Sequence, residues 1–243
     1  MNVLTHYLAG CAVLIAGAAM SSANAHQIEA PLAADKPAFD FHHADIIRKD
    51  TVLEFSMYFE GQPGTQTPDA HGQLAGAQVW SYVWPTSIDS SVIGFDKDSG
   101  ILSFAVTSHP DFDDTPLFDE DGDGDPENDG RRWHSHWVVL VPADTCGPNG
   151  LKVQDIPEGA TPNLPKTWPG LPILIDSPGW HPRFTESSLV VTVPFDAQTD
   201  LKGANFDAVT AALQVNASVH DPLLCVTAVF EAAGGLKMPG VIE

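Results

Sequence analysis

Basic residues are scarce in this chain. Lys and Arg number 11 among 243 residues, against 32 Asp and Glu, so the formal net charge is −21 at pH 7. A field of this sign repels the phosphates of nucleic acids and of anionic lipids, and it attracts cations. The composition therefore excludes nucleic acid as an expected partner and favours metal ions.

Long apolar runs are also lacking. The run Leu8–Met20 is too short to span a bilayer, and no second stretch approaches transmembrane length. It precedes the small-residue site Ala23-Asn24-Ala25, which predicts a signal peptide over residues 1–25 with cleavage after Ala25. The segment before the run contains no Lys or Arg, which is unusual for a signal peptide. We expect a periplasmic or secreted protein with no membrane span.

Cysteine is rare as well, with three in the whole chain. Removal of residues 1–25 would leave Cys146 and Cys225, and an oxidising compartment favours one disulfide bond between them. Two free thiols or a metal-binding pair are the alternatives. Nucleophile, P-loop and dinucleotide-binding signatures are absent from the sequence, so no reaction of those classes is indicated.

The remaining pattern predicts a β protein. Short alternating or β-branched apolar runs are separated by 20 Gly and 20 Pro residues. We predict an all-β fold, an antiparallel β-sandwich or barrel-like single domain over residues 26–243, with long Pro/Gly-rich loops. Residues Phe206–Ala212 are predicted to form a helical turn or short helix, and Gly147–Pro172 to be irregular. The candidate strands are Phe39–Ile47, Val52–Phe59, Gln78–Trp84, Ile101–Thr107, Trp133–Val141, Pro172–Ile175, Leu189–Phe195, Leu213–His220 and Leu224–Glu231.

An acidic loop carries the most specific local signal. Asp119, Asp121 and Asp123 occupy positions 1, 3 and 5 of a calcium-type loop, and Gly124 occupies position 6, where the chain must turn. The segment resembles the DxDxDG loops of EF-hands, dockerins and thrombospondin-type repeats over about a dozen residues. That resemblance implies a structural Ca²⁺ ion.

The loop departs from the EF-hand pattern at position 12, which is Gly130 instead of a bidentate Glu. Another carboxylate would have to supply that ligand, and the acidic side chains in reach along the sequence are Asp111, Asp113, Asp114, Asp125, Glu127 and Asp129. The alternative is a solvated acidic loop without an ion.

Directly after this loop, His134 and His136 lie two residues apart on a predicted strand. Residues at that spacing project from the same face, so the two imidazoles can share one Zn or Cu ion. His-x-His on a strand followed by Trp is similar to the zinc-ligand strand of α-type carbonic anhydrases, and cupins use a similar pair. The alternative is a pair of histidines hydrogen-bonded to the acidic loop.

A third ligand is expected from another segment. The first candidate is His43 or His42, adjacent residues on a strand, of which only one can face the pair. The second is His109, because it leads into the acidic loop. Separately from this site, cleavage after Ala25 would expose His26 as a new N-terminus, whose amine and imidazole together can bind copper like a histidine brace.

These features predict an exported metal-binding protein with Ca²⁺ in the acidic loop and Zn²⁺ or Cu²⁺ at the histidines. One alternative is a metal-dependent enzyme with an open coordination position. Another is a carbohydrate-binding module with structural calcium, in which Trp80, Tyr82 and Trp84 would form a same-face row for a sugar or another small molecule. Core packing is the expectation for that aromatic row.

Overall fold

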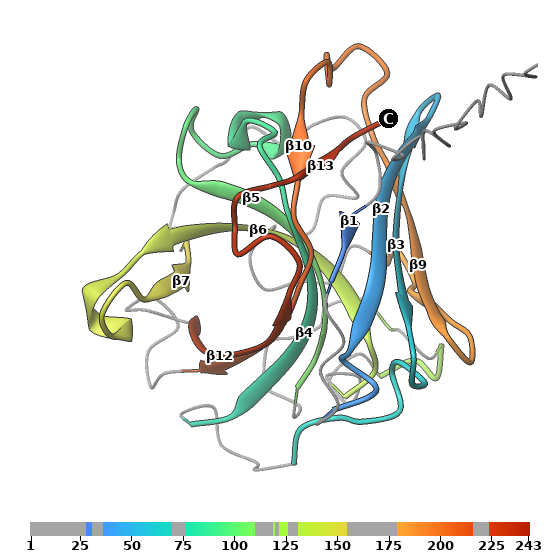
Figure 1. Cartoon of the computed structure of the whole chain (residues 1–243), viewed down its shortest axis with the longest axis vertical. Coiled ribbons are helices and arrows are strands. Elements are labelled where there is room, and N and C mark those ends of the chain that lie inside the picture. Colours follow the sequence, from blue (N-terminus) through green and yellow to red (C-terminus); the bar gives the residue numbers. More distant parts are fainter. Residues whose placement is uncertain are drawn as a thin grey trace, which may run out of the picture.

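The protein is built almost entirely from β-strands, as a computed structural model shows (Figure 1). The structure describes residues 28–30, 36–69, 76–109, 119, 122–125, 131–154, 179–215 and 224–243. Two short 3₁₀ helices, Ser90–Ile93 and Asp144–Cys146, are the only helical elements within these ranges. The predicted all-β class is confirmed.

Six strands close into a barrel. In the order in which they are hydrogen-bonded, the barrel strands are β11 (Val209–Val215), β12 (Leu224–Ala232), β7 (Leu151–Val153), β6 (His134–Pro142), β5 (Ile101–Ser108) and β4 (Gln78–Pro85). All neighbours are antiparallel, and the barrel closes where β11 pairs with β4. Closure leaves the longer strands β4, β5 and β6 with partners on both sides, which protects their backbone groups from solvent.

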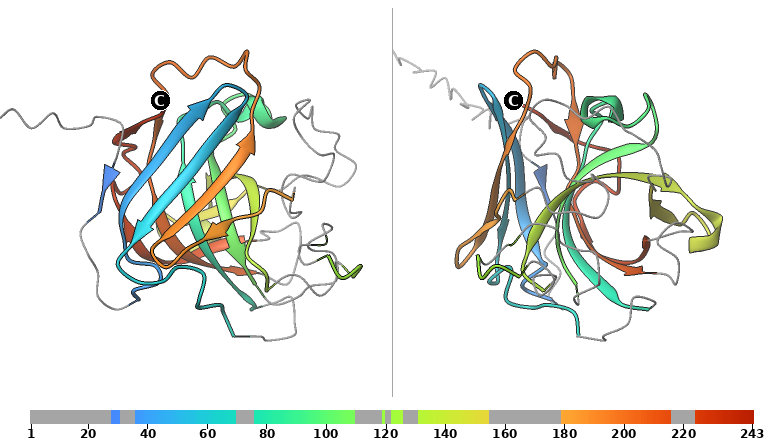
Figure 2. Two further views of the ribbon diagram at one scale, coloured as in Figure 1. Left: turned by 90° about the vertical axis from the view of Figure 1, so that its right-hand side faces the viewer. Right: turned by 180° about the vertical axis from the view of Figure 1, so that it is seen from behind.

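A second sheet packs against the outside of the barrel (Figure 2). Its five strands, in order, are β1 (Ile28–Glu29), β2 (Phe41–Lys49), β3 (Val52–Phe59), β9 (Ser188–Pro194) and β8 (Arg183–Phe184). A small pairing of β10 (Asn205–Phe206) with β13 (Gly240–Val241) completes the strands. The molecule is thus a barrel with a second sheet packed on its outer face. This arrangement combines the barrel and the sandwich that the sequence predicted as alternatives.

Aromatic side chains fill the space between sheet and barrel. Phe55 of β3 stacks on Phe104 of β5 at a centroid distance of 4.4 Å. Phe104 also meets Trp137 of β6, and the indole of Trp84 donates a hydrogen bond of 3.2 Å to the Ser56 carbonyl across the two layers. These contacts bury large side chains in one continuous core, where each contributes about 2 to 3 kcal/mol by burial.

The alternate residues of the same barrel strands face the interior of the barrel. Val83, Ala105, Val138 and Leu140 pack there with residues of β7 and β11 in a second, smaller core. Because successive residues of a strand point to opposite sides, β4, β5 and β6 are buried on both faces. Tyr82 and Trp84 are fully buried and Trp80 packs on the same core, so the expectation of core packing for that row is confirmed.

Most of the expected strands are present with shifts of one or two residues, but two predictions were wrong. The region Phe206–Ala212 is not a helical turn, because Val209–Val215 pairs with β4 on one side and with β12 on the other. The irregular segment Gly147–Pro172 contains β7, whose Val153 is buried inside the barrel. In both cases tertiary pairing overrides local preference. Pro172–Ile175 and residues 216–220 lie outside the described residues.

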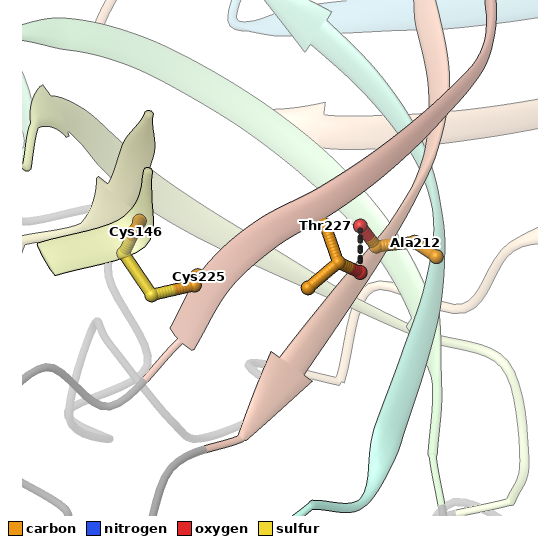
Figure 3. Close-up of a disulfide and its surroundings, with 4 residues drawn as sticks. All are labelled: Cys146, Ala212, Cys225 and Thr227. Carbon is orange, nitrogen blue, oxygen red and sulfur yellow. Dashed lines mark hydrogen bonds between the residues drawn. A yellow bond between two sulfur atoms is a disulfide. The ribbon is translucent and has the colours of Figure 1, made fainter. Parts of the chain in front are cut away.

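Cys146 and Cys225 form a disulfide bond with a Cα–Cα distance of 5.5 Å (Figure 3). The bond lies at the narrowest pairing in the barrel, because β12 meets β7 through the single residue pair Cys225 and Lys152. It joins the 3₁₀ turn after β6 to the start of β12. The predicted pairing is confirmed, and the covalent bond reinforces the barrel where hydrogen bonding is sparsest.

Replacing both cysteines with alanine should lower the free energy of unfolding by up to about 4 kcal/mol, because the bond closes a long loop in the unfolded chain. Urea unfolding of the oxidised protein and of the double variant measures the difference. Intact-mass analysis after alkylation provides the control: two alkylated thiols at these positions in the unreduced protein would contradict the assignment.

Candidate metal centre

Two histidines of β6 face the interior of the barrel. His134 pairs with Thr107 of β5, and His136 pairs with Ala105. Both histidines lie on the same face of the strand as Val138 and Leu140, which pack inside the barrel. His134 is completely buried and His136 is 5% exposed. The predicted same-side projection of the two imidazoles is therefore present in the structure.

His109 is the third imidazole of this group. It follows the last residue of β5 and is 5% exposed. Its Nε2 lies 3.1 Å from Nε2 of His134. The His109 and His136 rings each lie 4.8 Å, centroid to centroid, from the His134 ring. Of the two sources expected for a third ligand, the structure brings in His109.

A threonine hydroxyl lies between the two β6 histidines. Thr107 Oγ1 is 3.1 Å from Nε2 of His136 and 3.4 Å from Nε2 of His134. Sequence reasoning missed this residue, although Thr107, near the end of β5, and His109, directly after it, repeat the two-residue spacing of His134 and His136 on β6. We refer to Thr107, His109, His134 and His136 together as the histidine row.

The tautomer of His134 is fixed by the backbone. Nδ1 of His134 lies 2.6 Å from the Arg132 carbonyl, which can only accept, so Nδ1 carries the hydrogen. Nε2 of the neutral ring then presents its lone pair to the row, as a metal ligand must. Burial, followed by the neighbouring His136 and His109, holds the pKa of His134 well below its ordinary value of 6.5, so the ring stays neutral at pH 7.

The row is not a finished metal site by itself. Within the described residues, no group of three or more His, Cys, Asp or Glu side chains is arranged to hold a metal ion. The Thr107 hydroxyl occupies the position between His134 and His136, so the donors form a chain of four atoms and not a closed group of three nitrogens. The Thr107 hydroxyl is therefore part of any coordination of an ion by the histidine row.

The acidic loop and the histidine row belong to one hairpin connection. Residues 109–133 join β5 to β6, so His109 begins the connection and His134 follows it directly. Ser108 Oγ donates a hydrogen bond of 3.0 Å to the Arg131 carbonyl and closes the base of the connection. The histidine row and the acidic loop therefore belong to the same end of the β5–β6 pair.

The described part of the acidic loop curls around one carboxylate. Asp119 accepts hydrogen bonds from the backbone N–H groups of Gly122 and Gly124, at 2.6 and 2.7 Å. Both glycines have positive φ, 76° and 92°, a conformation that favours glycine. Asp123 in turn accepts from the Asp125 N–H at 2.8 Å, and Asp123 and Asp125 are exposed. This local curl brings acidic side chains to solvent at the loop surface.

Other predicted ligands are placed elsewhere or not described. His43 lies on the opposite face of β2 from the buried Ala44, and its Nε2 is 2.9 Å from the Asp45 carboxylate. The whole aromatic core and the barrel wall separate that face from the barrel interior, so the structure does not bring His43 to the row. The expected ligands and sites that lie outside the described residues are His26, Asp111, Asp113, Asp114, Asp121, Glu127 and Asp129, together with the signal peptide 1–25.

No match to this chain is found among protein-family models, curated proteins or solved structures. Among the described residues, no helix has the length and apolarity needed to cross a membrane. Functional assignment therefore depends on the chemistry of the site.

The depressed pKa of His134 predicts a pH dependence of stability. The unfolded chain protonates this histidine near pH 6.5 while the folded chain keeps it neutral, so the unfolded state binds more protons at lower pH. In the presence of a chelator, the free energy of unfolding should fall as pH drops below 6.5, with a slope approaching about 1.4 kcal/mol per pH unit.

The variant His134→Gln should have a shallower slope between pH 6.5 and 5, and the exposed His181→Gln serves as the matched control. Chemical unfolding at several pH values measures both. An unchanged slope in His134→Gln would show that His134 is protonated in the folded protein.

Proposed function

We propose that this is an exported metal-binding β protein that holds a Zn²⁺ or Cu²⁺ ion at His109, His134 and His136. The observation that carries the proposal is the approach of two ring nitrogens, Nε2 of His109 and Nε2 of His134, to 3.1 Å. Two nitrogen ligands on one tetrahedral ion at about 2.05 Å lie about 3.3 Å apart. Nitrogens at this spacing need little movement to share an ion.

Charge and burial support the same function. All three rings are at least 95% buried, and burial favours the neutral form of His134 that a metal requires. Three neutral ligands leave the ion's charge uncompensated, and the net charge of −21, including the acidic loop on the same connection, offsets it. Enclosed rings favour retention of the ion over an open catalytic position.

Export is part of the proposal. A disulfide bond is typical of proteins that fold in an oxidising compartment, and Cys146–Cys225 fits that pattern. The apolar segment Leu8–Met20 and the site before His26 provide the sequence argument.

Metal analysis of the purified protein tests the proposed centre. We expect about one equivalent of Zn or Cu per chain, which dialysis against a chelator removes. His134→Gln and His109→Ala should each weaken zinc binding at least 10-fold. His43→Ala is the matched control and should bind as the unchanged protein does, because His43 pairs with Asp45 instead. Full stoichiometry in a His134→Gln, His136→Gln double variant would refute the centre.

We also propose that the acidic loop binds Ca²⁺, through Asp119, Asp121, Asp123 and Asp125. Its support is the 1-3-5-6 sequence pattern together with the curl of the chain around Asp119. Extracellular calcium modules of this kind bind with dissociation constants of roughly 10⁻⁴ to 10⁻³ M. The ion would be structural and would not compete with the histidine row, because calcium prefers oxygen ligands.

Adding 10 mM calcium should therefore stabilise the protein by about 1 to 3 kcal/mol and raise its melting temperature. Asp119→Asn keeps an oxygen that can accept the backbone hydrogen bonds but removes the charge, and it should abolish this increase. Asp200→Asn is the matched control, because Asp200 is an exposed carboxylate that also accepts a backbone N–H. A melting temperature insensitive to calcium in the unchanged protein would contradict the calcium site.

A further inference from the structure

The spacing of the donor atoms in the histidine row points to a fourth member of the metal site. Three distances link the four donors into a chain: His109 Nε2 to His134 Nε2 is 3.1 Å, His134 Nε2 to Thr107 Oγ1 is 3.4 Å, and Thr107 Oγ1 to His136 Nε2 is 3.1 Å. In a tetrahedral zinc site with bonds of about 2.0 to 2.1 Å, any two donors lie about 3.3 Å apart. All three distances are within about 0.2 Å of that value.

The ring positions agree with the donor positions. An imidazole centroid lies about 3.2 Å from an ion bound at Nε2, so the centroids of two tetrahedral ligands are about 5 Å apart. The centroid distances in the row are 4.8 Å for His109 with His134 and 4.8 Å for His134 with His136. Two of the three ring pairs are therefore already near the separation that a shared ion requires.

Given the proposed metal-binding function, we propose that Thr107 Oγ1 is the oxygen donor that completes this site and makes it selective for Zn²⁺ over Cu⁺. Zinc in proteins takes four donors in a tetrahedron and accepts nitrogen together with oxygen. Monovalent copper is softer, gains little from a hydroxyl oxygen and is stable with three nitrogen ligands. The Thr107 hydroxyl thus contributes to the binding of Zn²⁺ and not to the binding of Cu⁺.

The barrel wall holds this hydroxyl in place. Thr107 is a β5 residue in register with His134 on one side and with Ser81 of β4 on the other, and it is 8% exposed. As a β-branched residue in a strand paired on both sides, it has few accessible rotamers. Its hydroxyl is therefore ordered before an ion arrives, which lowers the entropic cost of coordination.

The test compares two ions in three proteins. Zinc affinity is measured by competition with a chromophoric chelator, and Cu⁺ affinity by competition with bicinchoninate under anaerobic conditions. Thr107→Val preserves shape and branching while removing the oxygen, and we expect a 10- to 100-fold loss of zinc affinity with a change of Cu⁺ affinity below about 3-fold. Thr107→Ser retains the hydroxyl and should keep zinc affinity within about 3-fold of the unchanged protein.

Each outcome decides the proposal. Unchanged zinc affinity in Thr107→Val, or equal losses for both ions, would overturn it, because a role in packing alone would affect the ions equally. If Thr107→Val does not fold, the comparison of Thr107→Ser with Thr107→Ala replaces it, with the same expected contrast. If the unchanged protein binds neither of these ions and metal analysis also finds no Cu²⁺, the proposed function itself fails. Zinc binding in that protein without loss in Thr107→Val would remove only the role of Thr107.

Discussion

The burial of β4, β5 and β6 on both faces is the constraint on which the rest of the structure depends. One face of each strand contributes to the aromatic core under the five-stranded sheet, and the other contributes to the small core inside the barrel. A polar side chain on such a strand has no access to bulk water, so it must find partners within the protein. The imidazoles of His134 and His136 and the Thr107 hydroxyl meet this requirement by contacting one another. The histidine row is therefore a consequence of the doubly buried wall as well as a candidate ligand set.

Sequence alone predicted the parts of the fold that depend on alternation along one strand. Val52–Phe59 was predicted without error, and the projection of His134 and His136 to one side followed from their spacing. Partners that depend on register between strands were not predictable from spacing. His43 was preferred over His109 because nothing in the sequence shows which sheet the His43 strand joins, and Thr107 was missed because its position opposite His134 exists only in the paired sheet. The calcium interpretation depends on a local pattern, and the structure describes only part of it.

Two kinds of electrostatic environment meet in the β5–β6 connection. The histidine row is buried, and its His134 ring is kept neutral by burial and by its neighbours. The described carboxylates of the acidic loop at positions 123 and 125 are exposed and can attract cations from solution. Exposed oxygen donors and buried nitrogen donors favour ions of different hardness, so the two proposed sites would not compete for the same ion.

The disulfide bond also links the two layers of the molecule through the chain between the cysteines. β12 is the last barrel strand in the sequence, and Cys225 is its second residue, 79 positions after Cys146. The interval between the cysteines contains β9 of the outer sheet and β11 of the barrel, so the covalent ring passes through both layers. In the folded protein Cys225 pairs with Lys152 of β7, so the bond lies where β12 meets β7. The bond thus closes a ring that contains β7 and β11 of the barrel together with β8 and β9 of the outer sheet, so the displacement of either layer from the other is limited by the length of the chain in that ring.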